Sequence, residues 1–70
     1  MIPKISIIIN GEERFIESDT SIKTLVEKLD LDIKKIAIEK NYEIIMPENF
    51  GDDVLMDGDR IEIVHFIGGG

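Results

Sequence analysis

The sequence has no cysteine and no tryptophan, and it has only one histidine. Without cysteine, the chain can form no disulfide, offers no thiolate to a metal ion and has no thiol nucleophile. The single histidine, His65, has no serine near it in the sequence, so we expect a solvent-facing strand residue and not a catalytic base. Four aspartates between residues 52 and 59 do not follow the calcium-loop spacing, and we expect no metal site. The sequence therefore predicts a protein on which enzymes act, and not an enzyme.

Basic residues are also few. The sequence contains eight lysines and arginines and fifteen aspartates and glutamates, which gives a formal net charge of −7. Phosphate backbones and anionic lipid surfaces repel such a protein, so we expect no nucleic-acid partner, no membrane partner and a partner with a basic surface. No apolar run approaches the length of a membrane span, and the first residues do not have the pattern of a secretory signal. We expect a cytoplasmic protein.

The first seventeen residues predict a β-hairpin. In Lys4–Ile9, Ile5, Ile7 and Ile9 alternate with the other residues and would share one face of a strand. Asn10-Gly11 follows, and this dipeptide is typical of a two-residue turn in which both residues need positive φ. Residues 12–17 would form the returning strand. Phe15 and Ile16 point to opposite faces of it, so the sequence does not indicate which face is buried.

A helix is predicted after this hairpin. Ile22, Leu25, Val26 and Leu29 recur at the spacing of one helical face, which indicates about three turns that pack on a core. Thr20 or Ser21 would cap the first free amides of this helix.

The second half of the chain predicts strands at 35–40, 43–46 and 60–66. Between them, residues 47–51 would form an irregular turn or a short helical piece anchored by Phe50, and Leu55 would fill the core. With the first and last strands parallel at the centre, one helix would cover one face of a mixed sheet of four to five strands. The predicted fold class is α+β, in the β-grasp or ubiquitin-like arrangement. We expect this domain to span residues 1–67.

Residues 68–70 are all glycine and form a predicted flexible tail. Four extended residues, Ile67–Gly70, reach roughly 13 Å. Because glycine has no Cβ, such a tail can carry its terminal carboxylate through a channel too narrow for side chains. A frayed terminus or a cloning scar is the alternative interpretation.

The last predicted strand also has an apolar outer face. Ile61 and Ile63 fit the core, whereas Val64 and Phe66 lie on the opposite face. We expect Val64, Phe66 and Ile67, joined by Ile8 from the neighbouring strand, to form a partner-binding surface beside the tail. The alternative is that these residues are ordinary scattered surface hydrophobics.

These features together resemble the ThiS family, the small ubiquitin-like sulfur carriers of thiamin thiazole synthesis. The resemblance covers Lys4 to Gly70, nearly the whole chain. It rests on Asn10-Gly11-Glu12, the Thr20–Leu29 helix, the segments 36–41 and 44–47, and above all the ending from Leu55 to Gly70. The earlier motifs are common to many β-grasp domains, whereas this ending is close to a signature.

The resemblance implies a specific chemistry. A ThiF-type adenylating enzyme would bind the carrier and use ATP to adenylate the carboxylate of Gly70, while Gly68 and Gly69 thread its channel. Sulfur from a persulfide donor would displace AMP and leave a thiocarboxylate, which a ThiG-type thiazole synthase would consume. The carrier itself would bind no cofactor. Many relatives end in two glycines and this chain ends in three, which lengthens the slim segment.

Two alternatives stay open. A carrier similar to MoaD of molybdopterin synthesis, or one that serves another sulfur-transfer route, would share the chemistry. A ubiquitin-like interaction module or protein modifier would not transfer sulfur. Deletion of Gly70 distinguishes the sulfur carriers from the interaction module, because a carrier must lose its function and a pure binding module must not.

Overall fold

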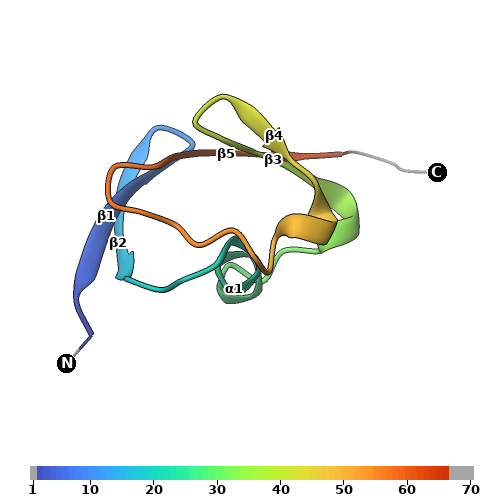
Figure 1. Ribbon diagram of the computed structural model, residues 1–70. Coiled ribbons are helices and arrows are strands. Elements are labelled where there is room, and N and C mark those ends of the chain that lie inside the picture. Colours follow the sequence, from blue (N-terminus) through green and yellow to red (C-terminus); the bar gives the residue numbers. More distant parts are fainter. Residues whose placement is uncertain (1, 67–70) are drawn as a thin grey trace.

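The computed structural model of the protein describes residues 2–66, which form a curved five-stranded sheet that arches over one α-helix (Figure 1). The elements follow one another in the order β1 (Lys4–Ile9), β2 (Glu12–Glu17), α1 (Ile22–Lys28), η1 (Ile33–Lys35), β3 (Ile36–Lys40), β4 (Glu43–Ile45), η2 (Pro47–Asn49) and β5 (Arg60–His65).

The order of strands across the sheet is β2-β1-β5-β3-β4. The central pair, β1 and β5, is parallel, with Ile8 opposite Arg60 and Ile9 opposite Ile61. The other three pairs are antiparallel, so the sheet is mixed. One helix on one face of this sheet is the β-grasp arrangement that the sequence predicts.

Both hairpins turn through two residues with positive φ. In the first turn φ is 48° at Asn10 and 84° at Gly11, and in the second it is 52° at Asn41 and 71° at Tyr42. Positive φ at both positions matches the right-handed twist of the flanking strands, which is why such turns favour asparagine and glycine. The Asn10-Gly11 turn is therefore confirmed.

Helix α1 begins where the sequence predicts but is shorter than three turns. The Ser21 hydroxyl oxygen accepts a hydrogen bond from the Thr24 amide at 3.1 Å and caps the first turn. The helix ends after seven residues because Asp30 takes a left-handed conformation, with φ 58°. The Asp30 amide donates to the Glu27 carbonyl and the Leu31 amide donates to the Val26 carbonyl, which is the hydrogen-bond pattern of a Schellman motif.

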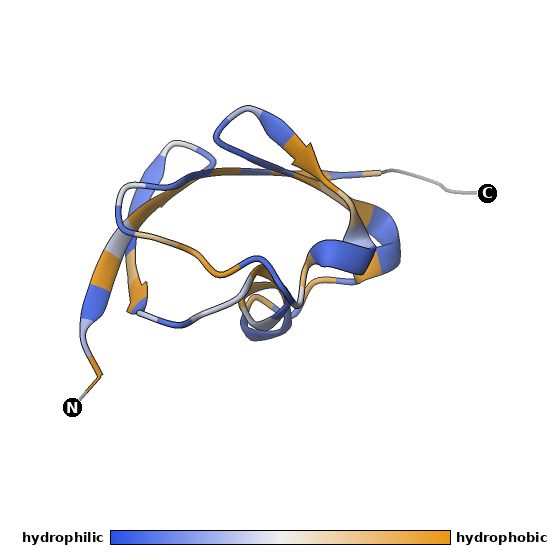
Figure 2. Ribbon diagram, viewed as in Figure 1, coloured by the Kyte–Doolittle hydropathy of each residue, from blue (hydrophilic) through white to orange (hydrophobic). Residues whose placement is uncertain are grey.

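The core lies between α1 and the concave face of the sheet, and apolar stretches of ribbon face each other across it (Figure 2). Phe50 and Leu55 are each 1% exposed, as predicted, and Ile16 packs against the core while Phe15 points outward. The buried apolar residues are Ile7, Ile9, Ile22, Leu25, Val26, Ile36, Ile38, Phe50, Leu55 and Ile61.

The segment between η2 and β5 closes the side of this core. It hydrogen-bonds to the start of α1, where the Ile22 amide donates to the Asp53 carbonyl at 2.9 Å. It also bonds to β1, where the Ile8 amide donates to the Asp59 carbonyl at 2.9 Å. These bonds hold the segment between helix and sheet, so that β5 begins at a fixed place.

Candidate functional site

The end of β5 is the root of the C-terminal segment, and both neighbouring strands hold β5 in place. On the β3 side, the Phe66 amide donates to the Lys35 carbonyl at 2.8 Å, which continues the pairing one residue past β5. On the β1 side, the Asn10 carboxamide binds both backbone groups of Ile63. These bonds therefore hold the chain from Ile63 to Phe66, the last residue that the structure describes.

Exposed apolar side chains gather around this root. Val64 is 57% exposed and Phe66 is 55% exposed, as predicted for the face of the sheet that the helix does not cover. Val64 lies opposite Ala37 on β3, and the β3–β4 register continued by one residue brings Met46 level with Ala37. Phe66, Ala37 and Met46 also line a common apolar hollow of about 410 Å³, together with Ile44. We call Ala37, Ile44, Met46, Val64 and Phe66 the tail-side cluster.

Ile8 is exposed but is not part of this cluster. It lies opposite Arg60, four residues along β5 from Val64. Between them the Arg60 guanidinium binds the Glu62 carboxylate at 2.7 Å, and it also lies 4.7 Å from the centre of the Tyr42 ring. The Arg60–Glu62 ion pair thus separates the apolar cluster near the end of β5 from the exposed side chain of Ile8.

The sequence interpretation missed Ile44 and Met46, which are 69% and 52% exposed. The run Ile44-Ile45-Met46 contained a signal, because three consecutive apolar residues cannot all face the core from one strand. Their position two strands from Val64, on the same outer face, depends on the order of β5, β3 and β4 in the sheet, which no local pattern gives.

The other predicted site residues lie at the C-terminus. Ile67, Gly68, Gly69 and Gly70 are outside the described residues. His65 is exposed, as predicted for a strand residue that faces solvent. Within residues 2–66, no group of three or more histidine, cysteine, aspartate or glutamate side chains could hold a metal ion. In the same range, no helix has the length and apolar character needed to cross a membrane.

Comparison with known proteins identifies relatives along nearly the whole chain. The model of the ThiS family matches residues 7–70. The sulfur carrier protein ThiS of Bacillus subtilis is 41% identical over 63 residues, which are 89% of this chain and 96% of that protein. A thiazole synthase of Paramagnetospirillum magneticum is 41% identical over 64 residues, but the chain spans only 20% of its length.

A solved structure gives the same result for the fold. The crystal structure of the thiamine biosynthesis protein ThiS from Geobacter metallireducens superposes with a TM-score of 0.82 at 25% identity, covering 94% of this chain and all of that one. The match to the family model extends from β1 to Gly70 and so includes the tail-side cluster and the three glycines. The chain therefore belongs to the ThiS family of ubiquitin-like sulfur carrier proteins.

Proposed function

We propose that this chain carries sulfur on its C-terminal carboxylate for synthesis of the thiamin thiazole. The observation that carries the proposal is the family match through residue 70, since the residue that would be modified, Gly70, lies inside the matched range. The names of the relatives, ThiS and thiazole synthase, support the thiamin route over a molybdopterin route.

The proposed chemistry has two steps. A Gly70 carboxylate oxygen attacks the α-phosphorus of ATP on an adenylating partner, so that a C–O–P linkage forms and pyrophosphate leaves. The carboxylate is ionised at neutral pH and is therefore a ready oxygen nucleophile. A nucleophilic sulfur, which a persulfide donor supplies in the cell, then attacks the acyl carbon and AMP leaves. With a persulfide as the nucleophile, the product is an acyl disulfide, and a second thiol of the donor cleaves it to release the thiocarboxylate while the donor forms a disulfide. With hydrogen sulfide as the nucleophile, the product is directly the thiocarboxylate.

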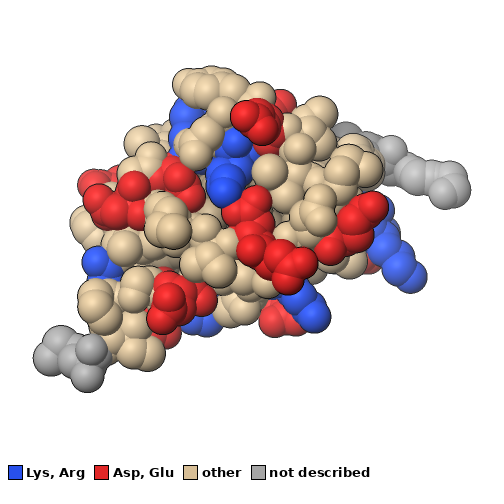
Figure 3. All heavy atoms as spheres, viewed as in Figure 1, with Lys and Arg blue, Asp and Glu red and all other residues tan. Residues whose placement is uncertain are grey.

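The chain's own part in this chemistry is to bind and to present its terminus. The tail-side cluster offers an apolar surface at the root of the tail, and desolvation of such a surface is the main source of docking energy. Bonds from Asn10 and Lys35 hold Ile63 and Phe66, the residues that precede the tail. The acidic surface would match a basic partner, and Figure 3 shows acidic side chains spread over the side of the molecule that is in view there.

Two partners follow from this proposal: a ThiF-type adenylating enzyme that charges the tail and a ThiG-type thiazole synthase that consumes its sulfur. The test is a reconstituted thiazole synthesis with purified synthase and the chain carrying ³⁵S in its thiocarboxylate. We expect the label to enter the thiazole product. Label that stays on the chain, with a synthase that is active on its own carrier, would contradict the thiamin assignment and favour another sulfur-transfer route.

A further inference from the structure

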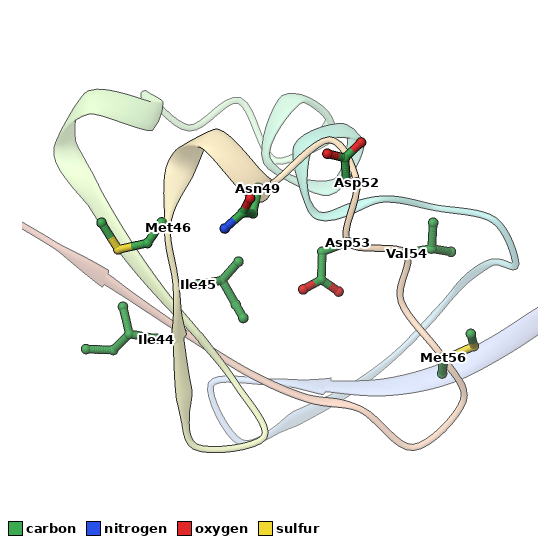
Figure 4. A pocket seen from close by; sticks show the side chains of 8 residues that line it. All are labelled: Ile44, Ile45, Met46, Asn49, Asp52, Asp53, Val54 and Met56. Atoms are coloured by element: carbon green, nitrogen blue, oxygen red, sulfur yellow. The ribbon is translucent and has the colours of Figure 1, made fainter.

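Beside the tail-side cluster, and sharing Ile44 and Met46 with it, the structure has a groove along the free edge of the sheet. This edge groove has a volume of about 570 Å³ and lies between β4 and the segment 49–56. Figure 4 shows the Ile45 and Asp53 side chains on opposite sides of it, with Val54 and Met56 on the same side as Asp53. Ile44, Ile45 and Met46 line it on the β4 side, and Asp52, Asp53, Val54 and Met56 line it on the facing segment. The Ile45 side chain points toward Asp53, whereas those of Ile44 and Met46 point to the other side of the strand (Figure 4).

The groove runs beside backbone N–H and C=O groups of β4 that point away from the neighbouring strand. Among residues 2–66, β4 is the last strand in the sheet and pairs only with β3. Lys40 and Glu43 form the pair that closes the two-residue turn, so their backbone groups bond to each other. Since bonding alternates along an antiparallel strand, the N–H and C=O of Ile44 point away from β3, toward the free edge.

The two edges of the sheet differ in how they are protected. At the other edge, four of the six residues of β2 are charged, in the sequence EERFIE, and charge discourages the addition of another strand. At the β4 edge, Ile44, Ile45 and Met46 are consecutive apolar residues. Ile44 is 69% exposed and Met56 across the groove is 65% exposed. The β4 edge is therefore apolar and accessible, although it is short.

Charge limits what can bind there. Among the described residues, the groove lining contains two carboxylates and no basic side chain. Asp53 is already paired with Lys40, whereas Asp52 makes none of the ion pairs found within residues 2–66. A second copy of this acidic chain would bring its own Asp52 and Asp53 to the interface, so like charges oppose self-association. A cationic occupant would complement the site.

We propose that the edge groove binds an extended segment of a partner protein, which adds to β4 as a sixth strand. This segment would carry apolar side chains toward Ile44 and Met56 and a lysine or arginine toward Asp52. Backbone bonds to Ile44 would supply part of the affinity and the side-chain contacts the specificity, as in other cases of strand addition. The proposal does not depend on sulfur transfer, because it does not involve Val64, Phe66 or the tail, although Ile44 and Met46 belong both to this groove and to the tail-side cluster.

The test uses an acetylated hexapeptide that alternates valine and lysine, with the full chain labelled with ¹⁵N. We expect titration to shift the amide signals of Ile44, Met46 and residues 52–56, and a peptide that alternates valine and glutamate to leave them unchanged. Shifts confined to β2 or to residues 64–66 would overturn the proposal, as would equal binding of the two peptides or concentration-dependent dimerisation through Ile44.

Matched variants separate the two parts of the proposed contact. Asp52→Lys should weaken binding of the valine–lysine peptide at least about fivefold, while Glu27→Lys, the same charge change on α1, should have little effect. Ile44→Pro removes the outward N–H, whereas Ile44→Thr retains it, so only the proline variant should abolish protection of the peptide's amides from hydrogen exchange. Val64→Asp should leave peptide binding unchanged. Equal effects within either matched pair would contradict strand addition at this groove.

Discussion

The carboxamide of Asn10 binds both backbone groups of Ile63, although the two residues are 53 positions apart. Its oxygen accepts from the Ile63 amide at 2.7 Å, and its nitrogen donates to the Ile63 carbonyl at 3.2 Å. β1 ends at Ile9, so the Asn10 side chain makes the hydrogen bonds to Ile63 that a further residue of β1 would otherwise make. The strand that leads to the C-terminus is thus held beyond the last backbone pair of β1 and β5.

We predict that Asn10→Gly lowers the free energy of unfolding by about 1–2 kcal/mol, because it removes two hydrogen bonds. Glycine tolerates the φ of 48° at this position, so the substitution removes the carboxamide without straining the backbone. The measurement is urea denaturation followed by circular dichroism. The control is Asn49→Gly, since the Asn49 side chain makes none of the hydrogen bonds found in residues 2–66. Equal midpoints for Asn10→Gly and the unmodified chain would show that the carboxamide contributes nothing.

The end of α1 gives a prediction of opposite sign. Asp30 occupies the left-handed position of the Schellman motif, where glycine has no Cβ penalty. We expect Asp30→Gly to raise the free energy of unfolding by about 0.5–1 kcal/mol. Thermal denaturation measures the change. Asp32→Gly serves as the contrast and should destabilise the protein, because the Asp32 carboxylate accepts from the Lys34 amide at 2.9 Å and caps η1. A lower melting temperature for Asp30→Gly would refute this interpretation of the helix end.

The tail-side cluster predicts where the adenylating partner binds. Val64→Asp places a charge in the middle of the cluster and should weaken binding to a ThiF-type enzyme by about tenfold or more. The fold should be unaffected, since Val64 is exposed. Isothermal titration calorimetry gives the dissociation constant. Phe15→Asp makes a similar change on the same face of the sheet, on the far strand β2, and should alter the affinity little. If both variants bind equally well, the docking surface lies elsewhere.

Much of this fold could be predicted from the sequence because its signals are local. The alternation in Lys4–Ile9, the Asn10-Gly11 turn and the spacing of Ile22, Leu25 and Val26 each act within a few residues, and each predicted element is present. The length of α1 was overestimated because Leu29 continues the apolar spacing, whereas the helix ends at the left-handed Asp30.

The site was harder to predict, because it depends on which strands are neighbours and in what register. The sequence indicated that Ile8, Val64 and Phe66 would be exposed, and they are. It could not indicate that the parallel register places Ile8 beside Arg60, away from Val64. Nor could it bring Met46 to the level of Val64, since the two residues are aligned only through Ala37 on the strand between them.

The slim tail gives a prediction about rate. Gly68→Val introduces a branched side chain into the segment that would thread the partner's channel, and it should slow adenylation. Gly68→Ala, which adds a single methyl group, should have a smaller effect. The measurement is ATP–pyrophosphate exchange catalysed by a ThiF-type enzyme, with the chain at saturating concentration. Identical exchange rates for all three chains would mean that no narrow channel surrounds this residue.

The central claim is that the Gly70 carboxylate accepts sulfur, and the most direct measurement is the intact mass of the chain. The chain is incubated with a ThiF-type enzyme, ATP and sulfide, and a chain that lacks Gly70 is treated in parallel. We predict a mass gain equal to the replacement of one oxygen by one sulfur in the full chain and no gain in the shortened one. An unchanged mass, with an enzyme that modifies its own carrier under the same conditions, would contradict the proposed role. A gain that persists without Gly70 would show that sulfur is carried elsewhere.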